Sequence, residues 1–497
     1  GNEISFEYND QEQIAKVNAY QKEIIYTYNA EKLLNSIHMD NKLYQCTYND
    51  FLNIEFILLN NNTLVHYEYN NDNQIKKITY GNENTCEFEY DWFNRLNKYK
   101  KGNKTYLYQY NNLGSLAKII SDTESYKYTY DYANRLSKFI TNNYIVDYTY
   151  DNNGNVLSKS FFYNGKKYDI QYKYDDNDNL IKITAEDFVI FLEYDYLGRL
   201  YQKNVNNEMI FTYSYITNGL KTSCVVRELK IGKDVYKYIY DDLYNITKIF
   251  INKELVYEYK YNENNHLDTE INYKLRYKYK YIYNEQFNLI KKQYYTLDNY
   301  LEKEENFEYK NSSWEDQLTN YNGQPITYDG AGNIKTLGDL TFEWENSREL
   351  IGISGKNSNI SYSYNINGIR TKKIVNGVVT EFVLDGYNVI LENRKDNVIY
   401  YIRDNIGDVI GIKYANQRYY FLKNLQGDII GIKNNNGEII ANYEYDAWGN
   451  ILKIVDEQGN PITDRKHIAH INPYRYRGYY YDEETNMYYL GKRYYSP

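Results

Sequence analysis

Three stretches of the chain repeat one pattern: residues 128–136 are YTYDYANRL, residues 148–156 are YTYDNNGNV and residues 172–180 are YKYDDNDNL. The unit is Tyr-x-Tyr, then Asp or Asn, two variable residues, Gly or Asn, Arg or Asn, and an aliphatic residue; the third stretch has Asp178 at the Gly or Asn position. The second aromatic residue recurs every 20 or 21 residues from Tyr8 to Tyr150. A fixed period of this length is typical of proteins in which each repeat packs on its neighbours, so the repeat decides the fold.

Each unit predicts a β-hairpin. Both rings of Tyr-x-Tyr lie on one face of a strand, because side chains alternate between faces, and tyrosine favours strands. The Asp or Asn that follows can accept a hydrogen bond from the main chain two residues on, and the later Gly or Asn tolerates a positive φ. We call these five residues, for example 131–135, the hinge turn. The hinge residues of the three clearest units are Tyr130, Asp131, Asn134, Tyr150, Asp151, Gly154, Tyr174 and Asp175.

Turns at the opposite ends of the hairpins are shorter and more varied. Asn164-Gly165 and Asn376-Gly377 are strong hairpin signals, because both residues accept the positive φ of a two-residue turn. No segment has a convincing helical stripe. We therefore expect the polar stretch from Glu302 to Glu308 to form a longer loop between hairpins.

Weaker copies of the unit continue to Tyr481, some with another residue in place of the second tyrosine, such as Trp344, Leu384, Arg403 and Lys423. The chain then holds about 23 units and on the order of 46 strands. The repeat becomes irregular in the final third of the chain, so we divide the chain into two regions. Residues 1–310 form a regular hairpin array, and residues 311–497 continue the array and add a distinct core.

The composition indicates a thin wall. The 497 residues include 67 tyrosines and only 4 prolines, so the chain is ordered, but few apolar residues other than tyrosine are left to fill a core. We expect tyrosine rings to stack between strands while their hydroxyls face water. Because sheets of more than about ten strands curl or split, we predict an all-β fold, a long spiralling antiparallel sheet that forms a hollow shell, partial or complete.

Charge and hydropathy exclude some classes of function. A net charge of -9 with interspersed charges does not suit a nucleic-acid partner. No apolar run is long enough to span a membrane, and the first residues lack a signal-peptide pattern. We expect the chain to begin inside a longer protein, because the repeat is already running at Tyr8.

Candidate sites for chemistry are few. Three cysteines, Cys46, Cys86 and Cys224, are too scattered for a disulfide framework, and we expect them to be small buried residues. His467 and His470 have a helical spacing but lack further ligands, so we interpret them as solvated loop residues. One Asp per 20 residues suits main-chain capping better than calcium. We expect no enzyme activity, no catalytic, cofactor-binding or metal site, and no cofactor.

The unit with Tyr-Asp at its hinge resembles the YD repeat of the Rhs family, which includes bacterial wall-associated toxins and, more distantly, the animal teneurins. Residues 420–431 and 443–450 are similar to the family's conserved core, and the end of the chain is the sharpest match. The matching core residues there are Asn472, Pro473, Arg475, Tyr476, Arg477, Gly478, Tyr481, Asp482 and Arg493. We expect the three arginines to stack on tyrosine rings.

The resemblance implies a β-shell that encloses a variable toxin domain carried in the same polypeptide. It implies two partners outside this chain, a C-terminal toxin domain in cis and N-terminal anchoring or plug regions, and a secreted, cell-wall or surface location. The alternative is a cell-wall, carbohydrate-binding or adhesion module. Clostridial glucan-binding and choline-binding repeats have a similar period, but they use aromatic cages that usually contain Trp, and this chain has 4 Trp in all.

Overall fold

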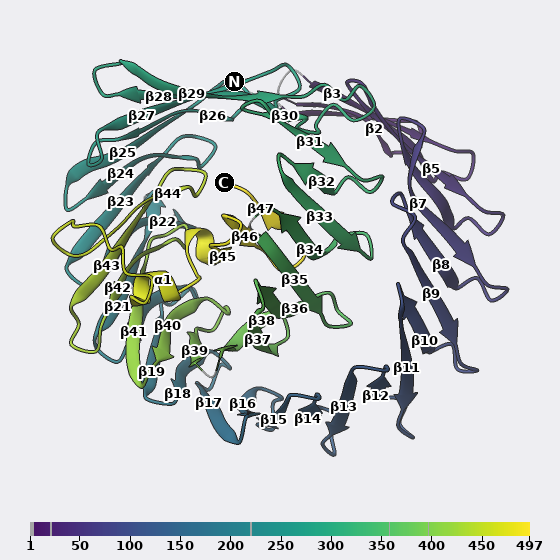
Figure 1. Ribbon diagram of the computed structural model, residues 1–497, viewed down its shortest axis with the longest axis horizontal. Helices are drawn as coiled ribbons and strands as arrows, with labels where there is room; N and C mark the ends of the chain where they lie inside the picture. The colour runs from purple at the N-terminus through teal and green to yellow at the C-terminus, as the bar shows by residue number, and fades with distance from the viewer. Residues whose placement is uncertain (1–3, 20–21, 219–220, 357, 396) are drawn as a thin grey trace. The chain divides into compact units, whose positions relative to one another are not determined.

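The computed structural model describes residues 4–19, 22–218, 221–356, 358–395 and 397–497 (Figure 1). These residues form 47 strands and two very short helices. Forty-four strands belong to one antiparallel sheet and three to a second sheet. The prediction of an all-β fold built from a long antiparallel sheet is therefore confirmed.

The first half of the chain contains strands β1 to β24. The first eleven are β1 (Ser5–Tyr8), β2 (Ile14–Ala19), β3 (Lys22–Tyr28), β4 (Leu34–Met39), β5 (Lys42–Tyr48), β6 (Ile54–Leu59), β7 (Asn62–Tyr69), β8 (Ile75–Tyr80), β9 (Thr85–Tyr90), β10 (Leu96–Lys101) and β11 (Lys104–Tyr110). The next thirteen are β12 (Leu116–Ile120), β13 (Ser125–Tyr130), β14 (Leu136–Ile140), β15 (Tyr144–Tyr150), β16 (Val156–Tyr163), β17 (Lys166–Tyr174), β18 (Leu180–Ala185), β19 (Phe188–Tyr194), β20 (Leu200–Val205), β21 (Met209–Asn218), β22 (Lys221–Ile231), β23 (Asp234–Tyr240) and β24 (Ile246–Ile251).

The second half contains the remaining strands and both helices. Ten strands are β25 (Glu254–Tyr261), β26 (Leu267–Asn272), β27 (Tyr277–Tyr283), β28 (Leu289–Thr296), β29 (Leu301–Glu308), β30 (Asn320–Tyr321), β31 (Gln324–Tyr328), β32 (Ile334–Leu337), β33 (Leu340–Glu345) and β34 (Glu349–Gly355). The last elements are β35 (Ser358–Tyr364), β36 (Arg370–Val375), β37 (Val378–Asp385), β38 (Asn388–Arg394), β39 (Asn397–Arg403), β40 (Val409–Tyr414), β41 (Gln417–Lys423), β42 (Ile429–Lys433), β43 (Ile439–Tyr445), β44 (Ile451–Val455), α1 (Ile468–Ile471), the 3-10 helix η1 (Tyr476–Gly478), β45 (Tyr480–Asp482), β46 (Met487–Tyr489) and β47 (Tyr494–Tyr495).

Each hinge turn closes a hairpin with a β-bulge at the second tyrosine. In the pair β13–β14, Tyr130 faces Leu136 while Thr129 faces Lys138, so Ser137 is an extra residue on the return strand. The same shift occurs at the second tyrosine of β15 and of β17. A bulge adds twist to the pair. The repeat therefore introduces one twist-enhancing irregularity per hairpin.

The short turns at the other ends of the hairpins have the predicted conformation. Asn164 and Gly165 have φ of 49° and 73°, and Asn376 and Gly377 have φ of 48° and 82°. Two successive residues with positive φ match the right-handed twist of the flanking strands. The hairpin signals in the sequence are confirmed at both positions.

The expected loop from Glu302 to Glu308 is wrong, because these residues form β29 and pair with β28. Glutamates of this polar strand form ion pairs with lysines. Lys291 Nζ lies 3.0 Å from Glu304 Oε1, and Lys303 Nζ lies 2.6 Å from Glu305 Oε1. A strand at a wet surface needs no apolar stripe when its charged side chains pair with one another and with those of the neighbouring strand.

The chain divides into two compact units. Unit 1 contains Gly1–Tyr108, Ile246–Lys248 and Leu255–Asn357, and unit 2 contains Gln109–Asn245, Ile249–Glu254 and Ser358–Pro497. Within each unit, hairpins that are far apart in sequence contact each other. The sequence-based boundary near residue 310 describes the regularity of the repeat and stays a prediction.

Ion pairs mark these long-range contacts. In unit 1, Lys42 Nζ lies 2.5 Å from Asp316 Oδ2, and in unit 2, Lys159 Nζ lies 2.6 Å from Asp385 Oδ2. Lys203 also pairs with Asp404 in unit 2, and both side chains are buried. Lys101 pairs with Glu349 in unit 1 in the same way. Within each unit, hairpins from late in the sequence therefore contact hairpins from early in the sequence through ion pairs as well as through packing.

A large apolar cluster lies in unit 2, where late hairpins meet the C-terminal segment. Ile399, Phe421, Ile432 and Ala441 are fully buried there, and they belong to β39, β41, β42 and β43. The cysteines do not share one environment, contrary to expectation: Cys86 is buried, Cys46 is half-buried and Cys224 is exposed. Within the described part of the chain, neither helix has the length and apolar composition needed to cross a bilayer.

Candidate functional site

The hinge turn of residues 131–135 shows how the repeat closes. Asp131 Oδ1 accepts hydrogen bonds from the N–H groups of Ala133 and Arg135, both at 2.9 Å. The N–H of Asp131 donates to the carbonyl of Arg135, and Asn134 has a φ of 58°. The predicted capping role is confirmed here. The main-chain N–H of Arg135, together with its guanidinium, lowers the pKa of Asp131.

The next two hinges repeat this geometry. Asp151 Oδ1 and Asp175 Oδ1 accept the N–H groups of Asn155 and Asn179, each at 2.8 Å. The Oδ2 atoms accept the side-chain amides of the same asparagines, each at 3.0 Å. Gly154 has a φ of 97°, in the region that favours glycine. Both oxygens of each carboxylate therefore accept hydrogen bonds within the turn.

The second tyrosine of each unit makes a contact that joins successive hairpins. Tyr150 donates its hydroxyl to the main-chain carbonyl of Leu136, at 2.7 Å, and Leu136 is the residue that follows the preceding hinge turn. Tyr130 and Tyr174 donate in the same way to the carbonyls of Leu116 and Val156. We call this series the hydroxyl ladder. Further members are Tyr28, Tyr48, Tyr69, Tyr90, Tyr194, Tyr215, Tyr240, Tyr261, Tyr283, Tyr328 and Tyr445.

The ladder corrects the expectation that these hydroxyls face water. It also explains two weak copies of the repeat. Trp344 Nε1 donates to the carbonyl of Ile334 at 2.7 Å, and Arg403 Nε and Nη2 donate to the carbonyl of Val389 at 3.0 and 2.9 Å. Tryptophan and arginine are acceptable at these positions because each supplies an N–H donor on a long flat side chain.

Hinge arginines add a second link between neighbouring hairpins. Arg135 Nη1 donates to the carbonyl of Asp151 at 2.8 Å, and its guanidinium lies 4.7 Å from the centre of the Tyr150 ring. Arg199 lies 4.2 Å from the Tyr215 ring in the same manner. A planar guanidinium can stack and donate at once, which suits this position.

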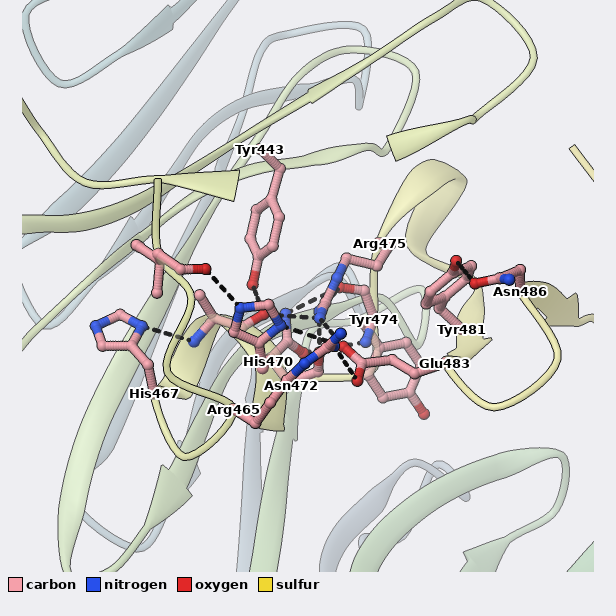
Figure 2. Close-up of polar contacts among 12 residues, drawn as sticks. Tyr443, Arg465, His467, His470, Asn472, Tyr474, Arg475, Tyr481, Glu483 and Asn486 are labelled. Atoms are coloured by element: carbon pink, nitrogen blue, oxygen red, sulfur yellow. Dashed lines mark hydrogen bonds and ion pairs between the residues drawn. The ribbon is translucent and has the colours of Figure 1, made fainter. Parts of the chain in front are cut away.

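One buried arginine, Arg475, joins several parts of the C-terminal core (Figure 2). Arg475 is fully buried, and its guanidinium donates to the carbonyls of Ala469, Asn472 and Tyr474. It lies 4.6 Å from the centre of the Tyr443 ring. Arg475 therefore holds the main chain around α1 in place, against a tyrosine of the last large hairpin.

Asn472 and Pro473 set the path of the chain into this core. Asn472 is fully buried; its Oδ1 accepts the N–H of Tyr474, and its Nδ2 donates to the carbonyl of the same residue. The carbonyl of Pro473 accepts the N–H of Tyr481 at 2.8 Å, and the Tyr481 hydroxyl donates to Asn486. All polar groups of this tight segment named here are therefore satisfied, as burial requires.

The stretch Tyr476-Arg477-Gly478 forms a turn against the sheet. Arg477 and Gly478 have φ of 54° and 66°, and the N–H of Arg477 donates to Asp428 Oδ1 at 2.8 Å. The Arg477 guanidinium lies 5.3 Å from the Tyr476 ring, and the Tyr476 hydroxyl donates to the carbonyl of Ala447. Burial raises the pKa of Asp428, although Asn424, Arg477 and Lys423 act against it.

Asp482 is the centre of a buried ionic cluster. Its Oδ2 lies 2.7 Å from Arg370 Nη1 and its Oδ1 lies 2.9 Å from Lys373 Nζ, and Arg370 and Asp482 have almost no exposed surface. Burial would raise the pKa of Asp482, but the positive charges of Arg370 and Lys373 outweigh it, so the pKa is lowered. Lys373 also pairs with Glu484 at 2.8 Å.

A second buried carboxylate, Glu392, accepts hydroxyls from both sides of the core. Tyr480 donates to it at 2.9 Å, Tyr401 donates to it as well, and Arg394 Nε lies 2.5 Å away. Tyr480 belongs to the C-terminal segment, whereas the other groups belong to β38 and β39. The C-terminal segment is thus fixed to the sheet by charged hydrogen bonds at two places.

The two histidines are not solvated loop residues. His467 is the N-cap of α1, where its Nδ1 accepts the N–H of Ala469, and burial lowers its pKa. His470 is mostly buried, with Nε2 2.8 Å from the carbonyl of Ile462 and Nδ1 3.4 Å from Glu483 (Figure 2). Among the described residues, no group of three His, Cys, Asp or Glu side chains could hold a metal ion.

Two of the three core arginines lie near tyrosine rings, and the third, Arg493, is exposed. Sequence reasoning missed Arg370, Lys373, Glu392 and Tyr443, the sheet residues that receive the core. They occupy ordinary strand positions, and no spacing marks them. All of these contacts neutralise buried charge or cap the main chain, so the site serves to anchor the C-terminal segment.

No family model matches the chain. Three curated proteins match it: "tRNA3(Ser)-specific nuclease WapA" of Bacillus spizizenii, "tRNA nuclease WapA" of Bacillus subtilis strain 168 and "tRNA(Glu)-specific nuclease WapA" of Bacillus subtilis subsp. natto. Each is 34% identical over 188 residues. These residues are 36% of this chain and only 8% of each relative.

Solved structures share the fold over nearly the whole chain. The crystal structure of TcdB2-TccC3-Cdc42 matches 99% of this chain and 32% of its own, with a TM-score of 0.68 and 14% identity. The Photorhabdus luminescens Tc holotoxin pore with a TccC3 mutation matches 99% of this chain and 32% of its own, with a TM-score of 0.64 and 14% identity. The repeat and the core residues resemble those of the Rhs/YD-repeat family, and the chain is similar in sequence to the three WapA proteins and in fold to the structures that contain TccC3.

Proposed function

We propose that this chain is a shell segment of a bacterial toxin and that it encloses an effector domain carried in the same polypeptide. The toxin-associated Rhs fold is shared with the TccC3 complexes, and the matching WapA proteins are nucleases far longer than the matched region. The single observation that carries the proposal is the anchoring of the C-terminal segment. Arg475, Asp482 and Tyr480 fix this segment to the sheet, so a domain that follows it would be held at a defined place.

The proposal gives this chain a structural role with no enzymatic activity of its own. Its carboxylates, such as Asp131 and Glu392, are used in capping and in buried hydrogen bonds. The effector domain in cis supplies the activity, and N-terminal regions supply anchoring. A secreted or surface location follows from the wall-associated toxins that the chain resembles.

Protease protection tests enclosure. The natural polypeptide that contains this chain and the segment after Pro497 is treated with proteinase K, beside the following domain expressed alone. We expect the domain to survive when the shell is folded and to be digested when it is alone. Equal digestion in the two samples would overturn enclosure.

A tRNA-cleavage assay separates the structural role from enclosure. We expect no cleavage by residues 1–497 alone. If the chain cleaves tRNA, and the rate stays the same after repeated purification, the chain has activity of its own and the structural role is contradicted. The protease test of enclosure would not be affected by that result.

A further inference from the structure

A cavity of about 420 Å³ lies within unit 2, and Phe382 in its lining also packs against Tyr480 of the C-terminal segment. Its lining comes from two stretches far apart in sequence, residues 123–148 and residues 365–386. The first stretch covers β13, β14 and part of β15, and the second covers the turn before β36, then β36 and β37. Its size falls within the range of small-molecule sites, which is about 300 to 1,000 Å³.

One side of the cavity is aromatic. Phe139 is the central ring: its centre lies 6.2 Å from that of Tyr126 at an interplanar angle of 10°, and 5.2 Å from that of Tyr128. Tyr144 meets Phe139 edge-on at 6.2 Å. The rings are held by their neighbours, so this surface is formed before any ligand arrives.

The rim of the cavity carries neutral amides. Asn142 is fixed, because its Oδ1 accepts the N–H of Ser125 and its Nδ2 donates to the carbonyl of Thr123. Asn143 and Asn367 lie beside it in the lining and are exposed. Amide groups can both donate to and accept from hydroxyls.

The charges of the lining residues exclude anionic ligands. No Lys or Arg is among the described residues that line the cavity, and its one carboxylate, Glu124, accepts the hydroxyl of Tyr126 at 2.6 Å. Phosphates and nucleic acids need cations, so they do not fit. A purely apolar ligand would cover the rings but would leave the rim amides without polar partners, which costs free energy.

We propose that this cavity binds a neutral saccharide unit, with the C–H face of a pyranose ring against Phe139 and Tyr128 and its hydroxyls on the amides of Asn143 and Asn367. An aromatic wall with a neutral amide rim matches a ligand that has one apolar face and many hydroxyls. This proposal does not depend on enclosure of a domain, and the two fail separately.

The test is saturation-transfer NMR of the whole chain with three soluble disaccharides, cellobiose, maltose and diacetylchitobiose, followed by titration. We expect saturable binding of at least one disaccharide. Phe139→Leu and the double variant Asn143→Asp/Asn367→Asp should each weaken it by roughly tenfold, the equivalent of about 1.4 kcal/mol. Asn177→Ala, at an exposed hinge turn outside the cavity, is the matched control and should leave affinity unchanged.

Because Phe139→Leu removes part of a packed aromatic group, its folding is checked by thermal unfolding, and the amide variants, which change only rim atoms, give an independent result. Three outcomes would overturn the proposal. They are the absence of saturable binding at millimolar concentration, binding that all the cavity variants leave unchanged, and binding of acetyl-phenylalanine amide in place of the sugars, which would identify a peptide site.

Discussion

Gly81 and Gly330 meet main chain to main chain in unit 1, although 249 positions separate them in sequence. A Cβ added to either residue would collide with the carbonyl oxygen of the other. Neither residue needs positive φ, so glycine is required here by space alone. This pair joins the turn after β8 to the hinge turn after β31, and nearby Asn82 Nδ2 donates to Asp329 Oδ2 at 3.1 Å.

Gly330→Ala should therefore destabilise the chain, because the added Cβ would meet main-chain atoms of Gly81 and not the movable end of a side chain. We expect a loss of about 1–3 kcal/mol, typical of overpacking. Gly352→Ala is the matched control: its added Cβ would lie 3.1 Å from a flexible carboxylate oxygen of Glu343. Chemical denaturation measures both, and an equal effect of the two substitutions would contradict the close-approach explanation.

Tyr150→Phe tests the hydroxyl ladder. It leaves the ring in place and removes the donor to the carbonyl of Leu136, so we expect a loss of about 0.5–1.5 kcal/mol in the free energy of unfolding. Tyr132→Phe is the control, because Tyr132 lies in the neighbouring hinge turn and is 94% exposed. If both substitutions have the same small effect, the ladder does not contribute to stability.

Acid should weaken the array at its hinges. The carboxyl pKa values of Asp91, Asp131, Asp175 and Asp195 are lowered, chiefly by hydrogen bonds from the Arg or Asn that ends each hinge turn. A folded pKa below the unfolded value gives stability that is present above the unfolded pKa, about 3.9, and is lost as pH falls through the folded pKa. We expect the temperature at which half of the protein is unfolded to decrease as the pH is lowered below about 4.

Asp131→Asn and Asp175→Asn remove the charge but keep a side-chain oxygen as a cap. A double variant should have a shallower dependence on pH below about pH 4 than the parent protein. Thermal unfolding followed by circular dichroism at several pH values makes the comparison, and identical slopes would argue against the hinge carboxylates.

Asp482→Asn should loosen the C-terminal segment. It leaves Arg370 buried with a neutral partner, which typically costs about 3–5 kcal/mol for a broken buried pair. Hydrogen exchange should rise first in β45 to β47. Arg493→Met, at an exposed position of the same segment, should change nothing, and a uniform rise across the whole sheet would show that the cluster is not a local anchor.

The hairpins could be predicted from the sequence because their determinants are local. Tyr-x-Tyr sets strand faces, and Asp131 and Asn134 set a turn within five residues. The long-range partners could not be predicted. Nothing in a 20-residue period specifies that Lys203 meets Asp404 or that Gly81 meets Gly330, because every unit offers similar lysines, aspartates and glycines.

The C-terminal core could be recognised from the sequence, but the sheet residues that contact it could not. Arg475 and Asp482 lie in a distinctive stretch, whereas Arg370 and Glu392 lie in ordinary strands. The polar strand β29 was missed for a related reason. Its stability comes from charge pairs such as Lys291 with Glu304, which depend on register and are absent from any apolar pattern.

The hydroxyl ladder has a consequence for how such chains change in evolution. Each bond joins one hairpin to the previous one and is accepted by a main-chain carbonyl, so it does not depend on the neighbour's side-chain identity. A whole repeat could be duplicated, deleted or exchanged between genes, and the new neighbours would restore the bond. A deletion of half a repeat would instead move the donor to the opposite edge. Length should therefore vary among related chains in steps of one complete hairpin.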